Sequence, residues 1–336
     1  MSVGLDIGSK TIKVVEINKN GNNYSLAGAG VVGHSGAGIE KLSEERDYIA
    51  LADVIRKLFK SSGINRKEVA VSLPEPQVFT RTIKLPLLTD QEVAAAIKWE
   101  AEQYIPIPVK DAIIQHQVLE RNSSGGVNEV IVLLVAAPRV LVEKYITLLN
   151  FAKLSVEAAE TELIALTRSI GTPNQTALLI DFGAKSVNIA ISKKGLLVFS
   201  RSIPTAGDAL TRAISQTLGV APAQAEEYKR VYGLSGSQLE GKIKTALEPI
   251  LKGVIDEIRK AIHFYQTDEK GDAPTAAIIS GGVAGTPELI SFLTSTLGIE
   301  VLIANPFNKV QVAQNTWSVL APYAPLYSIA VGLALR

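Results

Sequence analysis

The feature that most constrains the fold of this chain is a strand–turn–strand unit that occurs twice, far apart in the sequence. Residues 2–17 form two apolar strands around the turn Gly8-Ser9-Lys10, and residues 177–191 repeat the arrangement. A repeat at such long spacing indicates a duplicated domain rather than a solenoid of short repeats. It predicts an α/β protein with two related lobes. The aligned pairs are Asp6 with Asp181, Gly8 with Gly183, Lys10 with Lys185 and Thr11 with Ser186.

The turn of each hairpin is suited to binding phosphate. It points several backbone N–H groups into one space, which forms a nest for phosphate oxygens. Asp6 and Asp181 each end the preceding strand and are placed to hold Mg²⁺ through water, since this ion keeps most of its waters. Asp-x-Gly is also a common turn, but two registered copies after apolar strands favour the phosphate site. The expected phosphate contacts are Gly8, Ser9, Lys10, Thr11, Gly183, Ala184, Lys185 and Ser186.

Composition excludes several classes of function. The chain has 336 residues, no cysteine, three scattered histidines, and 34 basic against 33 acidic side chains. The absence of cysteine rules out thiol catalysis and disulfides, and the histidine pattern argues against a histidine-based metal site. Balanced charge gives no field directed at nucleic acid or an anionic membrane. With no signal peptide and no apolar run near the ~20 residues that span a bilayer, we expect a cytoplasmic protein without direct membrane insertion.

Two further elements fit a nucleoside. The apolar strand at 275–280 ends in Gly281-Gly282-Val283, where the glycines let the backbone approach a flat ligand. On the helix predicted at 222–232, Glu226 and Lys229 share a face. From the residues alone this pair is either a surface ion pair or a grip on the hydroxyls of a nucleoside.

Residues 85–153 look like an insertion. A helix is expected to begin at Thr89 or Asp90, followed by strands at 112–119 and 129–136 that are joined by the polar turn 122–126. A helix at 139–151 is expected to close this helix–strand–strand–helix unit. Trp99 on the first helix either packs into the insert's own core or belongs to a docking surface, because tryptophan is common in binding hot spots.

Together these elements resemble the actin, Hsp70 and sugar-kinase superfamily. The resemblance implies a two-lobed, duplicated, ribonuclease H-like fold that binds ATP or ADP with Mg²⁺, with Gly207, Glu226, Lys229, Gly281, Gly282 and Val283 on the nucleotide. The insert corresponds to the replaced subdomain (1C) of the FtsA branch. The implied organisation is a first lobe at 1–84, the insert at 85–153, a connecting helix at 154–170, a second lobe at 171–320 and a last connecting helix at 321–336.

One segment narrows the resemblance. Residues 96–108, Ala-Ile-Lys-Trp-Glu-Ala-Glu-Gln-Tyr-Ile-Pro-Ile-Pro, are similar to the signature of the PilM family of actin-like proteins in type IV pilus assembly or the related type II secretion. Further matches are 160–168, 206–211 and 330–336. The chain departs from the family's pattern at Ala206, where glycine is usual, and at Phe182, where an aliphatic residue is usual.

This resemblance implies an assembly protein that binds the N-terminal tail of a PilN-like single-span membrane protein, self-associates, and reaches the inner membrane through its partners. An FtsA-like division protein is an alternative, although such proteins usually add a C-terminal amphipathic helix after the core. A small-molecule kinase is a further alternative, but the chain lacks an evident base beside an acceptor hydroxyl. The sequence does not decide whether the protein has weak ATPase activity. Glu160 and Glu162 are the candidates to orient the attacking water, and Glu160 is preferred of the two. The alternative is that either residue only places a negative charge at a helix N-terminus.

Overall fold

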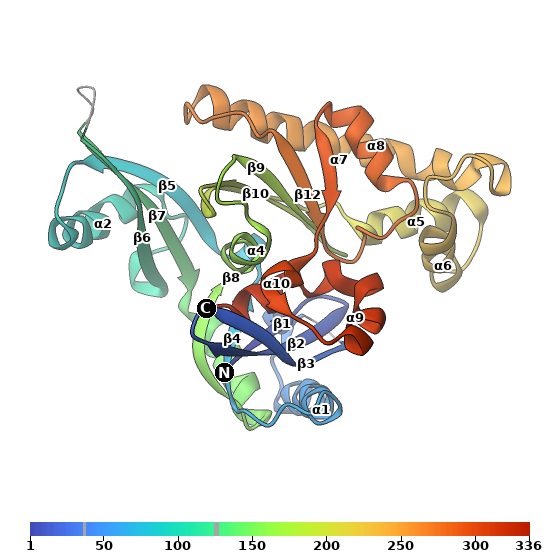
Figure 1. Cartoon of the computed structure of the whole chain (residues 1–336), viewed down its shortest axis with the longest axis horizontal. Helices are drawn as coiled ribbons and strands as arrows, with labels where there is room; N and C mark the ends of the chain where they lie inside the picture. Colours follow the sequence, from blue (N-terminus) through green and yellow to red (C-terminus); the bar gives the residue numbers. More distant parts are fainter. Residues whose placement is uncertain (36–37, 124–127) are drawn as a thin grey trace.

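The computed structural model describes residues 1–35, 38–123 and 128–336 and contains two lobes and an inserted subdomain (Figure 1). The first lobe is built on a six-stranded sheet in the order β14-β3-β2-β1-β4-β8. Helices α1 and α3 cover one face through an apolar cluster, while α10 packs on β1 and β2. The bounds are β1 Ser2–Ile7, β2 Thr11–Asn20, β3 Asn23–Gly33, α1 Glu45–Ser61, β4 Glu68–Leu73, α3 Arg139–Phe151, β8 Ser155–Thr161, β14 Val310–Gln311, α9 Gln314–Leu320 and α10 Ser328–Ala334.

The second lobe repeats this plan with a five-stranded sheet in the order β11-β10-β9-β12-β13. In both lobes the first strand pairs with an antiparallel hairpin partner on one side and a parallel strand on the other, β4 beside β1 and β12 beside β9. The predicted duplicated actin-like fold is therefore confirmed. The bounds are β9 Ala177–Phe182, β10 Val187–Lys193, β11 Leu196–Ile203, α5 Gly207–Leu218, α6 Pro222–Tyr232, α7 Lys242–Thr267, β12 Ala276–Ser280, α8 Leu289–Leu297 and β13 Glu300–Ile303.

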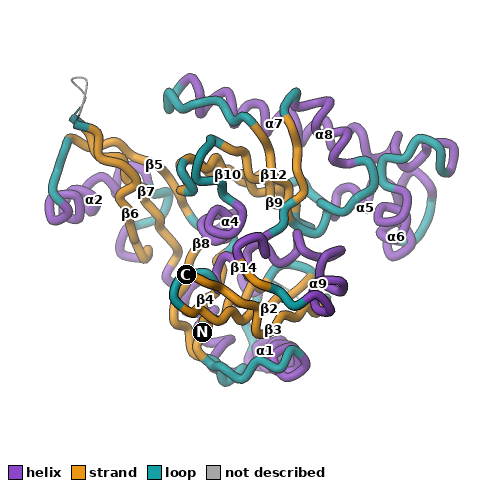
Figure 2. The backbone as a smooth tube through the Cα atoms, in the orientation of Figure 1, coloured by secondary structure: helices purple, strands orange, loops and turns teal. Residues whose placement is uncertain are grey.

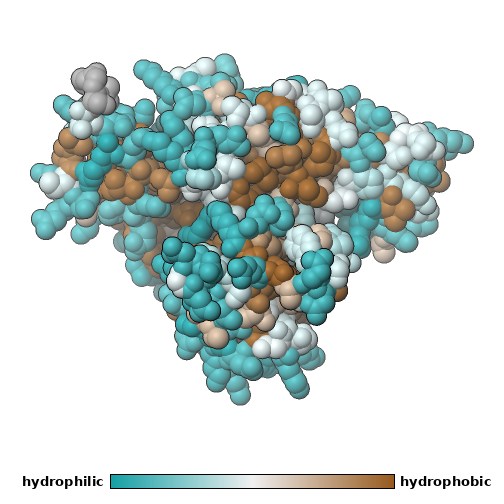
Figure 3. Space-filling model, viewed as in Figure 1, coloured by the Kyte–Doolittle hydropathy of each residue, from teal (hydrophilic) through white to brown (hydrophobic). Residues whose placement is uncertain are grey.

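Helix α7 packs the second lobe's sheet without the break considered at Pro249. The helix continues through this proline because its apolar face stays buried on both sides, from Leu247 to Leu251, Val254 and Ile258. The edge strand β13 of this sheet is less completely covered. Leu302 and Ile303 on β13 are exposed, and apolar residues gather over this part of the surface (Figure 3).

The inserted subdomain differs from the expected helix–strand–strand–helix unit at both ends. It begins with strand β5 (Phe79–Pro86) and ends with β7 (Glu129–Pro138), which lies between β5 and β6 (Ala112–Asn122) in a three-stranded sheet. Helix α3 belongs instead to the first lobe, because its apolar face packs against α1. Residues 124–127 of the predicted polar turn lie outside the described residues.

Helix α2 (Asp90–Tyr104) covers the insert's sheet, and the tube view shows this subdomain standing to one side of the two central sheets (Figure 2). The helix begins where the sequence predicted. Thr89 accepts a hydrogen bond from the backbone of Glu92, and the Glu92 carboxylate accepts one from the backbone of Thr89, so the two form a capping box. Val93, Ile97 and Ala101 form its buried face.

The lobes are joined by helix α4 (Glu162–Ile170) crossing α10. The first connecting helix was expected from residue 154, but residues 155–161 form β8, which pairs with β4. At the crossing the backbones approach so closely that a Cβ on Gly332 would lie 1.8 Å from the carbonyl oxygen of Ala165. Only glycine fits there, because any side chain would overlap the neighbouring helix.

One stretch, Gln314–Ala334, is by length and composition apolar enough to cross a membrane, so the expectation that no apolar run approaches this length was wrong. It comprises α9, a 3₁₀ segment and α10, and 61% of its apolar window is buried inside the fold. A buried core helix of a folded protein passes the same composition test. The stretch is therefore weak support for a membrane span.

Candidate functional site

The two hairpin turns have the same hydrogen bond. The N–H of Gly8 donates to the carbonyl of Thr11 at 3.1 Å, and the N–H of Gly183 donates to the carbonyl of Ser186 at 3.1 Å. Both turns border one cavity of about 130 Å³ between the lobes, lined by Gly8 and Ser9 from one hairpin and Lys185 and Ser186 from the other. The structure thus brings the two predicted phosphate turns to one place.

Asp6, at the end of β1, is buried and fully engaged. Its Oδ2 atom accepts a hydrogen bond from Lys13 Nζ at 2.8 Å, and its Oδ1 atom accepts one from Ser72 Oγ at 2.9 Å. Burial alone lowers the pKa of Lys13, but the charge and hydrogen bond of Asp6 outweigh it and raise that pKa above its usual value. Lys13 therefore carries a positive charge at the floor of the cleft.

Lys13 was missed in the sequence, although a signal for it was present. It is a lysine within the apolar strand β2, and in the β1–β2 register it lies directly opposite Asp6. A charged residue in an otherwise buried strand needs a partner, and a cross-strand carboxylate supplies one. His34 was also missed: its Nε2 lies 2.8 Å from the carbonyl oxygen of Gly8, and the ring lines the cavity. No sequence pattern marked it.

Asp181 occupies the matching position in the second lobe but is not paired in the same way. Burial raises its pKa to about 6, against the attraction of Lys13, and the nearby charge of Asp6 raises it further. The backbone of Gly281 passes directly over it. With φ at +90°, a Cβ on this glycine would lie 2.7 Å from Asp181 Oδ1, so glycine is required there.

Glu162, and not Glu160, faces the cavity, which reverses the preference drawn from the sequence. Both oxygens of Glu160 are held by Arg168 at 2.5 and 2.7 Å, and Arg168 also donates to the carbonyl of Gly332 at 2.7 Å. Glu160 therefore acts in an ion pair beside the helix crossing. Thr161 ends β8 and caps α4, so the chain changes from strand to helix between the two carboxylates and directs them to different sides.

The carboxylate of Glu162 is held by donors from two elements. Its Oε2 accepts hydrogen bonds from the Glu75 backbone N–H at 3.1 Å and from Asn188 Nδ2 at 3.0 Å. Burial raises the pKa of Glu162 well above its usual value, and the charges of Asp6 and Asp181 add to this effect. Burial therefore disfavours the charged form of this carboxyl group.

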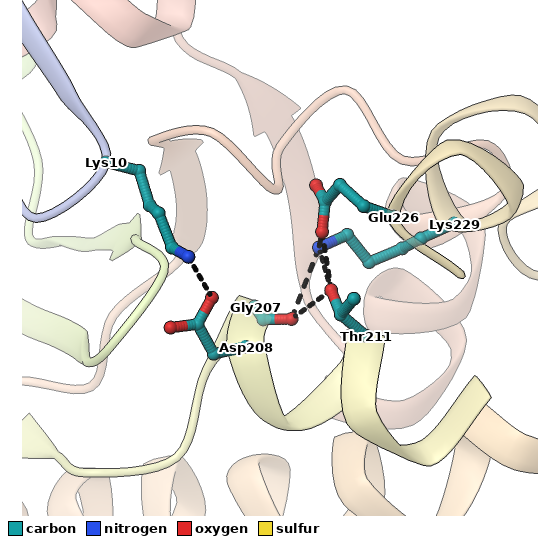
Figure 4. A network of polar contacts seen from close by, with 6 residues as sticks. All are labelled: Lys10, Gly207, Asp208, Thr211, Glu226 and Lys229. Carbon is teal, nitrogen blue, oxygen red and sulfur yellow. Dashed lines mark hydrogen bonds and ion pairs between the residues drawn. The ribbon is translucent and has the colours of Figure 1, made fainter. Parts of the chain in front are cut away.

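The second lobe forms a polar corner where α5 meets α6 (Figure 4). Lys229 is buried, and its Nζ donates to Glu226 at 2.6 Å, Thr211 Oγ1 at 2.9 Å and the carbonyl of Gly207 at 3.2 Å. The pair of Glu226 and Lys229 is thus not a surface ion pair, since only 6% of the Lys229 side chain is exposed. All three N–H donors of Lys229 are used in these contacts, whereas Glu226 is about half exposed, and neither residue lines the cavity between the hairpins.

One ion pair crosses between the lobes beside this corner. Lys10 Nζ, on the first hairpin, lies 3.5 Å from Asp208 Oδ1, at the start of α5 (Figure 4). Both side chains are partly exposed, so the pair contributes at most about 1 kcal/mol. Asp208 also donates its backbone N–H to the carbonyl of Ala184 at 2.8 Å, which fixes the second hairpin against the helix start.

The glycine turn after β12 is anchored under the same cleft. The N–H of Val283 donates to the carbonyl of Phe182 at 3.1 Å, and the Val283 side chain is buried in the second lobe's core. Val283 therefore supports the turn by packing and does not present its side chain to a ligand. Gly282 is more open, since the nearest atom to a Cβ there would be 3.6 Å away on Leu326.

Comparison with known proteins points to one family. A family model described as "Type IV pilus assembly protein PilM" matches residues 4–336. The solved structure of a "PilM-PilN type IV pilus biogenesis complex" has a TM-score of 0.85 and 26% identity, and covers 100% of this chain and 98% of that one. MreB5 of Spiroplasma citri bound to AMPPNP has a TM-score of 0.53 at 13% identity, covers 98% of this chain and 93% of that one, and shows the shared fold alone.

Sequence relatives include the cell division protein FtsA. FtsA of Streptococcus pneumoniae is 23% identical over 92% of this chain and 76% of its own length, and FtsA of Staphylococcus epidermidis is 28% identical over 69% and 54%. These proteins are more distant relatives with the same fold, so the alternative of an FtsA-like division protein is not favoured. The match over nearly the whole length shows that the chain belongs to the PilM family of actin-like type IV pilus assembly proteins.

Proposed function

We propose that this chain binds ATP in the cleft between its lobes. The observation that carries the proposal is the pair of hairpins with matching turn hydrogen bonds on one cavity. Their N–H groups would face phosphate oxygens, with the buried charge of Lys13 beneath them. Glu226 would meet the ribose hydroxyls and Lys229 would hold it in place, and the open backbone at Gly282 would lie beside the base.

Mg²⁺ fits this site only as an ion shared with the nucleotide. In the described part of the chain, no group of three His, Asp or Glu side chains is arranged to hold a metal, and both oxygens of Asp6 are already engaged. Asp181 has a carboxylate free of side-chain partners among the described residues, which suits an ion that keeps several waters and takes few protein ligands. When bound, the ion would neutralise phosphate charge.

Turnover is proposed to be slow. Glu162 is the carboxyl group on the cavity that could orient an attacking water, and Glu160 is occupied by Arg168. The Oε2 atom of Glu162 already accepts hydrogen bonds from the Glu75 N–H and from Asn188 Nδ2, and burial disfavours the charged form that would accept a proton from water. We therefore propose a protein that binds ATP more readily than it hydrolyses it.

We further propose that the insert docks the N-terminal tail of a PilN-like membrane protein, which would hold the chain at the cytoplasmic side of the inner membrane. The structural relative named above is a complex of PilM with PilN. On the insert, Trp99 is 76% exposed, so the interpretation in which it is a core residue does not hold. Tyr104, five residues later on the same helix, is partly buried against the insert's core, and Arg81 lies 4.4 Å from its ring centre. Tryptophan, tyrosine and arginine are the residue types enriched in binding hot spots.

Nucleotide binding is tested by calorimetric titration of ATP with Mg²⁺ into Asp181→Asn. The exchange keeps the shape of the side chain and removes its charge, so at least tenfold weaker binding is expected with an unchanged fold. Asp256→Asn, on the outer surface of α7, is the matched control and should bind like the unsubstituted protein. Equal affinity in both variants would contradict the proposed site.

Tail docking is tested by fluorescence anisotropy with a synthetic tail peptide of the PilN-like protein. Trp99→Ala should weaken binding at least tenfold, while circular dichroism and ATP affinity stay unchanged because Trp99 lies outside the cleft. Val319, a similarly exposed apolar residue on α9, gives the control Val319→Ala. If Trp99→Ala and a variant with the insert exchanged both bind the peptide as well as the unsubstituted protein, the peptide site does not lie on the insert.

A further inference from the structure

The two lobes and the insert meet at one short turn. Residues 74–77, Pro-Glu-Pro-Gln, connect β4 of the first lobe to β5 of the insert. The side chain of Glu75 is 5% exposed although it is charged in water. Its carboxyl group faces Thr161 and the N–H of Leu163 at the start of α4, Thr80 on β5, and Ser200 on β11 of the second lobe. This one group therefore borders every body of the molecule.

The same turn touches the nucleotide cleft. The N–H of Glu75 donates to Oε2 of Glu162, the oxygen that also accepts from Asn188 on β10. Asn188 in turn accepts a hydrogen bond from Ser202 Oγ at 2.7 Å. Pro74, Pro76 and Gln77 line the cavity between the hairpins. A ligand that moves the second lobe therefore moves groups in direct contact with this turn.

The hydrogen bonding at the junction is incomplete in this lobe arrangement. Glu75 Oε2 and Thr80 Oγ1 are both buried, and neither has a hydrogen-bond partner among the described residues. Buried polar groups without partners are rare because they lose their hydration without compensation. Burial raises the pKa of Glu75 to about 7, although the neighbouring Ser200, Thr161, Leu163 and Thr80 groups act to lower it. Because the Glu75 carboxyl and the Thr80 hydroxyl face each other, a shift of β5 against the turn would change the distance between them.

The insert is attached to the second lobe as well as to the first. Thr82 Oγ1 on β5 donates to the carbonyl of Val198 on β11 at 2.6 Å. Lys194, in the turn between β10 and β11, pairs with Glu120 on β6 at 2.7 Å. Because the insert is attached to both lobes, a change in the angle between the lobes must shift the insert relative to at least one lobe.

We propose that Glu75 is a positioning residue that couples the nucleotide cleft to the docking subdomain. The inference rests on the proposed binding of ATP and of the partner tail, and adds that each changes the affinity for the other. Closure on ATP would move Asn188 and Ser200 relative to the turn, let the Glu75 carboxyl exchange partners with Thr80, and shift β5. The effect is reciprocal, because coupling between two binding sites is a single free energy.

The test measures tail affinity by anisotropy with and without ATP and Mg²⁺, and ATP affinity with and without the tail. The unsubstituted protein should show a coupling of about fivefold or more, the lower end of the usual range. In Glu75→Gln, the ratio of the affinities measured with and without the other ligand should fall to within twofold of unity. The affinity for each ligand measured alone should change less than threefold. Glu68→Gln, at the exposed start of β4, is the matched control and should keep the coupling.

Thr80→Val separates coupling from stability. It removes the unpartnered hydroxyl at constant shape, so the melting temperature should hold or rise while the coupling is lost. If the junction had only a structural role, Thr80→Val would instead lower the melting temperature and keep the coupling. Unchanged coupling in both Glu75→Gln and Thr80→Val, or no coupling in an unsubstituted protein that binds both ligands, would overturn the inference. Failure of that protein to bind ATP or the tail would instead overturn the proposed function.

Discussion

Replacing Gly332 by alanine probes the contact that joins the lobes. The added Cβ would lie 1.8 Å from the Ala165 carbonyl oxygen and 2.5 Å from its carbon. Carbon and oxygen atoms approach comfortably at about 3.3 Å or more. The two helices must therefore separate by roughly 1.5 Å at the crossing, or one of them must rotate.

The cost follows from what surrounds the crossing. Every residue of α10 from Ser328 to Ala334 is buried, and Leu163, Leu166 and Leu333 pack in one apolar cluster beside it. Overpacking a filled core costs about 1–3 kcal/mol, and backbone atoms cannot move aside as a side chain can. We expect the free energy of unfolding to fall by about 3 kcal/mol, which lowers the melting temperature by about 5 °C or more.

Gly253→Ala is the matched control, because it makes the same substitution in another helix. Gly253 is exposed in the middle of α7, and a Cβ there meets no described atom within 4 Å. Alanine should therefore stabilise the protein by about 0.5–1 kcal/mol through its better helix propensity. Calorimetry and urea unfolding of both variants give the comparison. Equal stability of Gly332→Ala and the unsubstituted protein would refute the close crossing.

Three further predictions concern the cleft. Glu162→Gln should lower any ATP turnover about 100-fold while the affinity for ATP changes less than threefold, measured by phosphate release and titration. Lys229→Gln should weaken ATP binding about tenfold but leave inorganic triphosphate binding unchanged, because it removes the cation that holds Glu226 in place at the nucleoside corner. Since the pKa of Glu75 is raised from 4.5 to about 7, its contribution to stability is complete below about pH 4.5 and is lost as pH rises through 7. In the unsubstituted protein this loss should lower the free energy of unfolding by up to about 3 kcal/mol between pH 4.5 and 8, and Glu75→Gln should abolish that decrease in urea unfolding. If the free energy of unfolding of Glu75→Gln depends on pH as in the unsubstituted protein, the assigned burial is contradicted.

Local patterns in the sequence were sufficient for the phosphate hairpins and the duplicated fold. A hairpin is set by apolar strands and turn residues that are neighbours along the chain, so Gly8 and Gly183 could be assigned to their turns from the sequence alone. The capping box at Thr89 is local for the same reason. The family resemblance over residues 96–108 likewise depended on contiguous residues.

The tertiary structure alone decided which body each element joins and which partner each charge takes. Helix α3 has an apolar face that could cover any sheet, and only packing against α1 assigned it to the first lobe. Glu160 and Glu162 are equivalent by residue type, but Arg168, eight positions away from Glu160, holds one and leaves the other on the cavity. The exposure of Trp99 likewise depends on which face of α2 the insert's sheet buries. Apolar periodicity and charge are properties of neighbouring residues, whereas burial and pairing depend on segments brought together from distant parts of the chain.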